Sequence, residues 1–257
     1  MKILRSLNSA LVLITGTIFL TECQNPGPKE EKASAAPAVE SISKDNTLTP
    51  EEEKEGWVLL FDGKTMNGWR TYQNIPADDW ELADGNLHCK EEGVTKRADL
   101  ITNDQYDNFE LQIDWKIRQG ENSGIIYRAT EENGASYESG PEYQLIDDLG
   151  YPGKLSDKQH TGANYDMNPP MVSAVKPAGE YNHTRILVNG AHVEHWLNGQ
   201  KLVEYELWSP EWQKNKAASK WKDLATYGAA HQGHIALQDH GGGVWFKNIK
   251  IRRISEK

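Results

Sequence analysis

The chain has 257 residues, a formal net charge of −10 and an isoelectric point near 5.3. It contains no block of clustered Lys and Arg, which argues against nucleic acid as a partner, because phosphate binding relies on such clusters. Nine Trp and ten Tyr against four Phe supply flat apolar faces with polar handles, a choice that suits a β-sandwich core and also contact with sugars.

The first 23 residues have the pattern of a bacterial export signal. Residues 1–5 form a short basic segment, and residues 7–20 form an apolar stretch too short for a stable membrane span. Leu20-Thr21-Glu22-Cys23 resembles a lipobox, in which the cysteine is lipidated, although Glu22 stands where a small residue is usual. We expect an exported cell-envelope lipoprotein, periplasmic or at the cell surface, anchored to the membrane through Cys23. Ordinary secretion is the alternative.

Residues 24–55 are rich in Pro, Ala, Ser, Lys and Glu and contain no aromatic residue. Such a segment buries too little apolar surface to order itself, so we expect a flexible tether. Residues 56–257 then form one domain, long enough to bury a substantial core. If Cys23 is lipidated, Cys89 has no disulfide partner and is expected to be a small buried hydrophobe.

Period-two alternation dominates from residue 57 onward and predicts strands with one buried face. The clearest strand is 109–117; a turn at 120–124 and a returning strand at 125–128 predict a hairpin. Asn189-Gly190 and Asn198-Gly199 predict type I′ turns that join strands at 185–188, 193–197 and 201–203 into a meander. The last strand, 244–254, changes its alternation near Asn248, which indicates a bulge.

Only residues 210–224 have a plausible helical pattern, with Trp212, Trp221 and Leu224 as candidate apolar contacts. Many short strands, Gly and Asn turns and no alternating helices predict an all-β antiparallel sandwich or jelly roll. Two long irregular segments, 129–141 and 147–182, are of a length that favours a functional role or disorder.

The segment between these loops carries the candidate chemistry. Glu142 and Gln144 lie on one face of a predicted strand, and a bulge at Leu145 or Ile146 would return Asp147 to that face. The spacing resembles the E-x-D-x-x-E strand of laminarinase-like and lichenase-like glucanases, whose concanavalin A-like sandwich uses two carboxylates. Gln144 replaces the middle acid, so retaining-glycosidase chemistry, with carboxyl groups about 5–5.5 Å apart, does not transfer directly.

Several segments also resemble a bacterial family of 3-keto-glycoside-processing domains, and together they span the chain after the tether. They are Gly56–Lys64 with Gly68-Trp69, Asn122–Arg128, Gly140–Asp147, Thr161–Tyr165, and Ile235–Gly241 with Phe246–Ile249. The resemblance implies a concanavalin A-like lectin/glucanase jelly roll that cleaves a glycosidic bond in a sugar already oxidised at C3. A base removes the acidified C2 hydrogen, the enolate expels the C1 substituent, and water then adds, so that the net result is hydrolysis.

Such a site needs a base at C2, an electrophile near the C3 oxygen and an acid for the leaving oxygen. We assign the catalytic roles within Glu142, Asp147 and His160, with Glu142 as first choice for the base because partial burial raises a carboxyl pKa. His160 is a candidate for the acid or the base, because an imidazole can serve as either near neutral pH. The candidate substrate-binding residues are Arg128, Gln144, Tyr165, Gln238, Asp239 and His240.

Other interpretations stay open at this point. Glu142 and Asp147 could be solvated or salt-bridged, and strand alternation accounts for His183, His192 and His195 without chemistry. Oxygen ligands from Asp147, Asp148 and nearby carbonyls would suit a divalent cation, but no spacing demands one. The chain could also be a non-catalytic carbohydrate-binding module or an ordinary glucanase-like glycosidase. Gln144 counts against the glycosidase, and the polar strand counts against an aromatic binding platform.

Overall fold

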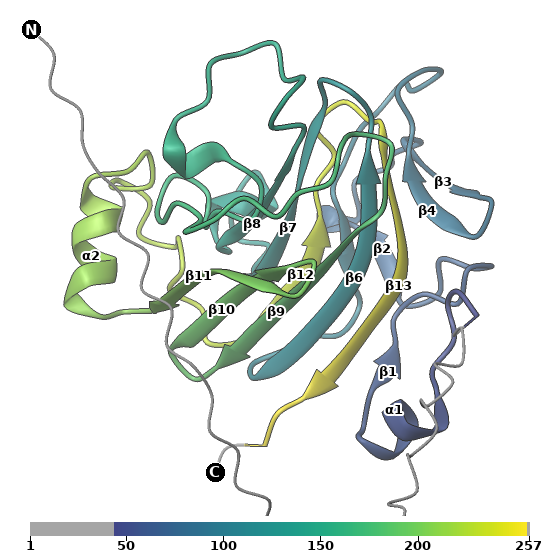
Figure 1. Ribbon diagram of the computed structural model, residues 1–257, viewed down its shortest axis with the longest axis horizontal. Helices are drawn as coiled ribbons and strands as arrows, with labels where there is room; N and C mark the ends of the chain where they lie inside the picture. Colours follow the sequence, from purple (N-terminus) through teal and green to yellow (C-terminus); the bar gives the residue numbers. More distant parts are fainter. Residues whose placement is uncertain (1–43, 256–257) are drawn as a thin grey trace, which may run out of the picture. The chain divides into compact units, whose positions relative to one another are not determined.

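The computed structural model describes residues 44–255, in which the chain forms an antiparallel β-sandwich (Figure 1). Cys23 and the predicted export signal lie outside the described residues, so export and lipidation stay predictions. Among the described residues, no helix is both long and apolar enough to cross a membrane.

Most elements of the described chain are short strands. The first strands are β1 (Val58–Leu59), β2 (Trp69–Thr71), β3 (Trp80–Ala83), β4 (Asn86–Cys89), β5 (Leu100–Thr102), β6 (Phe109–Ile117) and β7 (Asn122–Ala129). The others are β8 (Glu142–Ile146), β9 (Asn182–Asn189), β10 (His192–Leu197), β11 (Gln200–Glu206), β12 (His234–Leu237) and β13 (Val244–Arg253). The helices are α1 (Pro50–Lys54) and α2 (Pro210–Ala217), with short 3-10 turns η1 (Tyr72–Asn74), η2 (Ser136–Glu138) and η3 (Asp157–Gln159).

The strands form two sheets. The larger has eight strands in the order β11-β10-β9-β6-β13-β4-β3, with β1 paired to β13, and the smaller has five in the order β2-β5-β12-β7-β8. Every ladder between described strands is antiparallel. Figure 1 shows β6, β9, β10 and β13 as long neighbouring strands of the larger sheet. The predicted antiparallel jelly roll of the concanavalin A-like type is confirmed.

Strand β6 shows how alternation builds the core between the sheets. Phe109, Leu111, Ile113 and Trp115 are completely buried, while the residues between them face outward. Burying the indole of Trp115 contributes roughly 4–6 kcal/mol of transfer free energy. The indole N–H of Trp115 donates to Thr184 Oγ1 at 2.9 Å. The strand predicted most clearly from the sequence is therefore confirmed.

The predicted hairpin of β6 with β7 is wrong. Both edges of β6 are occupied by β9 and β13, whereas β7 pairs with β8 and β12 in the other sheet. The turn at 118–121 thus carries the chain from one sheet to the other. Alternation shows which face of a strand is buried but not which strand lies beside it, so the sequence favoured the nearest partner.

The meander of β9, β10 and β11 is confirmed. Its two turns differ, however. Asn198 and Gly199 both have positive φ, 48° and 82°, as in a type I′ turn, whereas in the first turn only Gly190, at 62°, does, which fits type II′. In β13 the register shifts between Lys247 and Lys250, and Asn248 has φ 52°, so the bulge near Asn248 is confirmed.

Residues 44–55, assigned above to the flexible tether, are ordered against β13. Asn46 N–H donates to Asn248 Oδ1 at 2.6 Å, and Asn248 N–H donates back to Asn46 Oδ1 at 2.8 Å. Helix α1 begins with a capping box between Thr49 and Glu52, and the Glu52 carboxylate pairs with Lys250. As the composition predicted, α1 buries no residue. Residues 44–55 are ordered by polar contacts instead.

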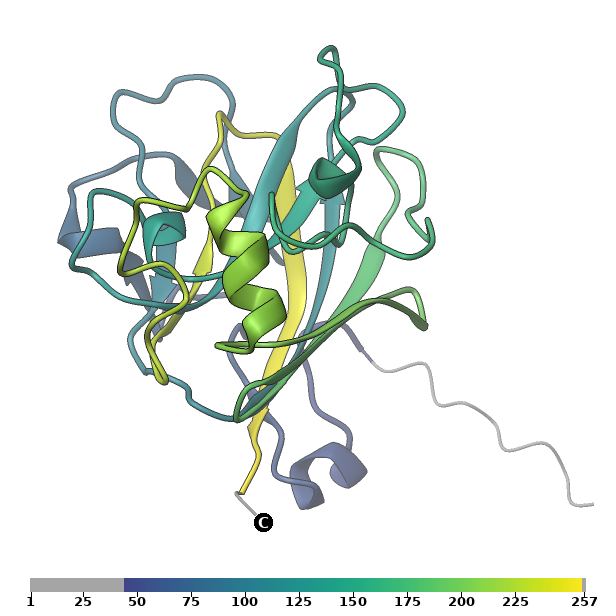
Figure 2. The same ribbon diagram turned by 90° about the vertical axis from the view of Figure 1, so that its left-hand side faces the viewer.

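The predicted helix over 210–224 ends earlier than expected, at Ala217. Ser219 stops it, because its hydroxyl donates to Lys216 O at 2.8 Å and accepts from Trp221 N–H at 3.1 Å. Trp221 then turns inward and stacks on Tyr227 with ring centroids 4.5 Å apart. Figure 2 shows α2 facing the viewer on the flank of the sandwich. The early stop directs Lys220 toward the site described below.

His195, which alternation placed as an ordinary strand residue, is completely buried. Its Nδ1–H donates to Gly162 O at 2.9 Å, so Nε2 accepts from the Tyr127 hydroxyl, also at 2.9 Å. Burial lowers the pKa of the imidazole to about 4. The ring therefore stays neutral and fastens the 147–182 segment to β10.

This burial predicts acid-sensitive stability. Between pH 6.5 and about 4 the unfolded chain binds a proton at His195 that the native state does not, so stability is lost as pH falls through this window. The contribution is about 3 kcal/mol when the shift is fully expressed. Urea unfolding at pH 7 and pH 4.5 would show a smaller loss for His195→Gln than for the wild type. Equal losses in both proteins would contradict the assignment.

Candidate functional site

A polar cavity of about 160 Å³ lies on the outer face of the smaller sheet. Tyr143 and Leu145 of β8 point into the core, so the alternating Glu142 and Gln144 point away from it. No register shift separates the β7 and β8 partners, which means that the expected bulge at Leu145 or Ile146 is absent. The side chains that line the cavity are Asn122, Tyr137, Glu142, Gln144, Tyr165, Lys220, Gln238 and His240.

Segments far apart in the sequence meet at this cavity. Both long irregular segments contribute, Tyr137 from η2 within 129–141 and Tyr165 from 147–182. The second segment runs beside β8: Gln144 N–H donates to Ala163 O at 3.1 Å, and Tyr165 N–H donates to Glu142 O at 3.0 Å. These backbone bonds close the free edge of β8 and fix Tyr165 over the cavity.

Glu142 is the buried acid of the cavity, with only 4 % of its surface exposed. Burial raises its pKa to about 8, the charge of Asp99 adds to the rise, and Lys220 opposes it. Among the described residues its carboxyl group has no hydrogen-bond partner. Space for the group exists because residue 124 is glycine: a Cβ there would lie 2.6 Å from Glu142 Oε1.

Lys220 brings a cation to the same cavity. Its Nζ lies 4.1 Å from the ring centroid of Tyr165 and 4.2 Å from that of Trp221, an arrangement that favours the charged form. Partial burial nevertheless lowers its pKa, against the opposing charges of Glu142 and Asp166. The cavity thus holds a carboxyl group whose pKa is raised beside an ammonium group whose pKa is lowered.

Asp147, predicted to be catalytic, does not line this cavity. It follows β8 and caps two turns: Oδ2 accepts from Gly120 N–H at 2.9 Å and Oδ1 from Leu149 N–H at 3.3 Å. Because β8 has no bulge, Asp147 does not return to the face of Glu142. Its carboxylate instead holds the crossover from β6 to β7 through Gly120.

His160 and the proposed cation ligand Asp148 belong to a different surface cavity. Asp148 Oδ1 lies 3.4 Å from His160 Nδ1 and accepts from Thr161 N–H at 3.0 Å. The imidazole is therefore paired away from Glu142. Asp147 and Asp148 accept from different backbone N–H groups, of Gly120 and Leu149 for the first and of Thr161 for the second.

Arg128 is also placed elsewhere. It is 2 % exposed, and its guanidinium donates to Asp107 O at 2.7 Å and to Gly190 O at 3.0 Å. These bonds tie β7 to the turn between β9 and β10. Arg128 does not line the cavity of Glu142.

Asp239 faces a second cavity rather than that of Glu142. It forms a cluster with Asp79 and Cys89 whose ligand atoms lie within 4.8 Å of one another. Cys89 is completely buried, as expected, and its thiol donates to Asp239 Oδ1 at 3.2 Å. Burial and the hydrogen bond with Asp239 raise the pKa of Asp79 to about 6. One buried carboxyl oxygen of Asp79, Oδ1, has no hydrogen-bond partner among the described residues.

Another possible ligand cluster in the described chain, His192, Glu194 and Glu204, lies on the surface of the larger sheet. Its members are already paired with neighbours: His192 with Glu206 at 2.6 Å, and Glu194 with Lys201 at 3.4 Å. It lines neither cavity near Glu142.

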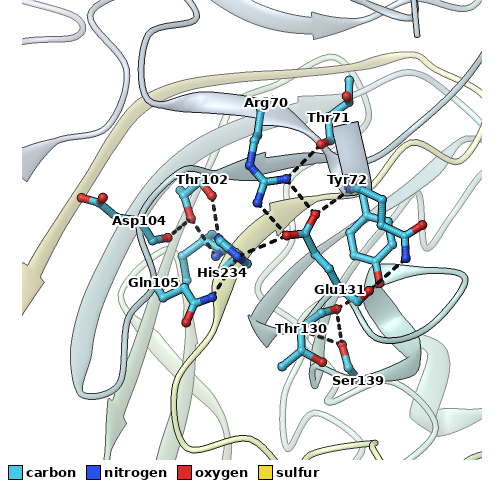
Figure 3. A network of polar contacts seen from close by, with 12 residues as sticks. Arg70, Thr71, Tyr72, Thr102, Asp104, Gln105, Thr130, Glu131, Ser139 and His234 are labelled. Atoms are coloured by element: carbon cyan, nitrogen blue, oxygen red, sulfur yellow. Dashed lines mark hydrogen bonds and ion pairs between the residues drawn. The ribbon is translucent and has the colours of Figure 1, made fainter. Parts of the chain in front are cut away.

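The segment that carries Tyr137 is fastened to β2 by the network in Figure 3. Arg70 donates to both oxygens of Glu131, at 2.7 and 2.6 Å. The backbone N–H of Gln73 donates to the same carboxylate at 2.7 Å. Tyr72 donates to Thr130 O at 3.0 Å. The network therefore positions the wall of the cavity from outside it.

We expect Arg70→Ala to lower the free energy of unfolding by about 2 kcal/mol, because a bidentate, partly buried ion pair is lost. We expect the folded variant to keep most of its activity, since no member of the pair lines the cavity of Glu142. Arg118→Ala is the control, since Arg118 makes an exposed ion pair with Glu91 and should cost under about 1 kcal/mol. Equal effects of the two variants would show that the network does not stabilise the segment.

Comparison with known proteins identifies the family. Residues 56–252 match the model of the 3-keto-alpha-glucoside-1,2-lyase-like domain. A 3-keto-disaccharide hydrolase of Bacteroides thetaiotaomicron is 34 % identical over 88 % of this chain and 90 % of its own. The chain belongs to this family. The relative from Bacteroides thetaiotaomicron is thus named for the hydrolysis of a glycoside.

Two solved structures agree with the assignment of the 3-keto-glucoside-lyase-like domain. A candidate glycosyl hydrolase from Parabacteroides distasonis is 40 % identical, with a TM-score of 0.77, and covers 82 % of this chain and all of its own. A second from the same organism is 30 % identical, with a TM-score of 0.59, over 77 % of this chain and 99 % of its own. The sandwich described above is therefore the fold of these relatives.

The sequence predicted five of the eight residues that line the cavity of this domain: Glu142, Gln144, Tyr165, Gln238 and His240. It missed Asn122, Tyr137 and Lys220. Asn122 was within a segment used for the family resemblance, and Tyr137 was in a loop already marked as long. Lys220 carried no local signal, because only the stop of α2 at Ser219 brings it to the cavity.

Proposed function

We propose that this domain cleaves 3-keto-disaccharides by elimination and hydration, with Glu142 as the base. The proposal is supported by the family and by a relative named for hydrolysis of such sugars. The observation that carries it is the carboxyl group of Glu142, buried in a polar cavity without a hydrogen-bond partner among the described residues, with a pKa raised to about 8. A carboxylate of that basicity is suited to abstract a carbon-bound proton near neutral pH.

The proposed reaction has two stages. Glu142 takes the C2 proton, and the electron pair of that C–H bond forms an enolate with the C3 carbonyl. The enolate collapses, C1=C2 forms, the C1–O bond breaks, and the leaving oxygen takes a proton. Water then adds its hydroxyl to C1 and a proton to C2, which gives the free 3-keto sugar and the released alcohol.

Other cavity residues fill the remaining roles. The Lys220 ammonium stabilises the enolate oxygen at C3, because a cation in a partly desolvated site interacts strongly with developing negative charge. His240 lies at the exposed rim of the cavity and donates to the leaving oxygen. Gln144 and Gln238 present amides to the sugar hydroxyls. Asp147 and His160 have no part in this scheme.

The test is product analysis in D₂O with trehalose oxidised at C3 of one ring and with unoxidised trehalose. Elimination and hydration place one solvent deuteron at C2 of the released keto sugar, and only the oxidised substrate is cleaved. Direct hydrolysis would leave C2 undeuterated. Incubating 3-keto-glucose without enzyme corrects for spontaneous exchange. Cleavage of the unoxidised parent would identify an ordinary glycosidase, and binding without cleavage would identify a carbohydrate-binding module.

A further inference from the structure

A second cavity, of about 180 Å³, adjoins the one that contains Glu142. Tyr137 lines both cavities, and so the two adjoin at this residue. The residues after β12 also divide between them: Gln238 and His240 line the first cavity, whereas Asp239 lines the second. The two spaces are therefore adjacent compartments of one region on the smaller sheet.

The size of the first cavity requires such a neighbour if the substrate has two sugar rings. Sites for small molecules usually enclose roughly 300–1,000 Å³, and the cavity of Glu142 encloses only about 160 Å³. We propose that the second cavity is the subsite for the leaving sugar, so that the domain recognises both rings of a keto-disaccharide. This inference rests on the function proposed above.

The second cavity has the chemistry to bind an uncharged polyol. Arg97 donates from Nη1 to Asp239 at 2.9 Å and from Nη2 to Glu91 O at 3.1 Å, and the guanidinium has further N–H donors to offer. Asp99 accepts from Asp239 N–H at 3.0 Å and from the Ser136 hydroxyl, and each carboxylate oxygen has a second lone pair for a sugar hydroxyl.

An apolar surface completes this compartment. Ile75 and Tyr137 both line it, and Ile75 is 36 % exposed. Sugar rings pack against such faces through their C–H groups while their hydroxyls bond to charged side chains. Because Tyr137 lines both cavities, a sugar held by Asp99 in the second cavity would lie next to the ring held in the first.

The test compares binding of two ligands that share the keto ring but differ in the leaving group. The Glu142→Gln protein is titrated calorimetrically with C3-oxidised trehalose and with methyl 3-keto-α-glucoside. We expect the disaccharide to bind at least about tenfold more tightly, as one or two hydrogen bonds to charged groups provide. Ala135 lines the second cavity and has extended backbone, φ −144° and ψ 153°, which accepts any side chain. Ala135→Trp in the same background fills the space and should remove the tenfold preference.

Arg97→Ala should reduce the preference, and Arg118→Ala, whose side chain lines neither cavity, should keep it. Equal affinities for the two ligands, no binding of either, or an equal weakening of both by Ala135→Trp would overturn the subsite. Failure of the proposed function has a different signature, because the wild type would then leave both keto sugars intact while the binding preference persists.

Discussion

Glu142→Gln is expected to lower kcat/KM on a 3-keto-disaccharide by about 10²–10⁴-fold, the usual contribution of a positioned general base. The amide keeps the size of the carboxyl group and cannot accept the C2 proton. Glu121→Gln is the matched control, because Glu121 lies beside β7 but lines neither cavity. A Glu142→Gln protein with wild-type turnover would remove this residue from the mechanism.

The raised pKa of Glu142 adds two dependences on pH. Activity of the wild type should increase as pH rises through about 8, because the base must be ionised. The free energy of unfolding should change in the opposite direction. Between pH 4.5 and 8 the native state holds a proton on Glu142 that the unfolded chain has lost, so the free energy of unfolding falls as pH rises through this range. Urea unfolding at pH 6 and pH 9 would show a smaller loss for Glu142→Gln. An activity that falls through pH 8 would instead make Glu142 an acid.

Gly124→Ala is expected to reduce kcat by about 10²-fold while the fold is kept. The added Cβ would lie 2.6 Å from Glu142 Oε1 and 2.9 Å from its Cγ, so the carboxyl group must move, and displacements of about 1 Å can cost that much. Gly124 does not have positive φ, so the stability cost is that of overpacking, about 1–3 kcal/mol. The measurement is kcat and KM together with urea unfolding.

The shorter acid provides the control for this prediction. Glu142→Asp withdraws the carboxyl group from residue 124, so the double variant Gly124→Ala, Glu142→Asp should lose less activity than the two single losses combined. Additive losses would mean that Gly124 acts through the fold rather than through the position of the carboxyl group.

The sequence was most informative where short-range patterns decide the structure. Alternation along 109–117 predicted the face of β6 that packs in the core, and the change near Asn248 predicted the bulge. Glu142 and Gln144 were placed on one face by the same period. These features depend on residues within a few positions of one another, and for that reason a single sequence contains them.

The remaining features depend on contacts between distant segments. Asp147 was expected beside Glu142 because a bulge was assumed, and only the register with β7 shows its absence. His160 was expected in the site because it lies in a nearby loop, but Asp148 holds it in another cavity. Lys220 reaches Glu142 across about eighty positions of sequence. No local pattern reports such juxtapositions.

The polar attachment of residues 44–55 determines how the domain would respond to tension on its N-terminal side. A pull on the chain before residue 44 is carried by Asn46 to Asn248 and by Glu52 to Lys250, and both partners belong to β13. Strand β13 is paired along its length with β6 and also with β4, so the load is shared as shear across the larger sheet. The cavity of Glu142 is built on β7 and β8 of the smaller sheet. The strands that would carry the load and the proposed sugar site therefore lie in different sheets of the sandwich.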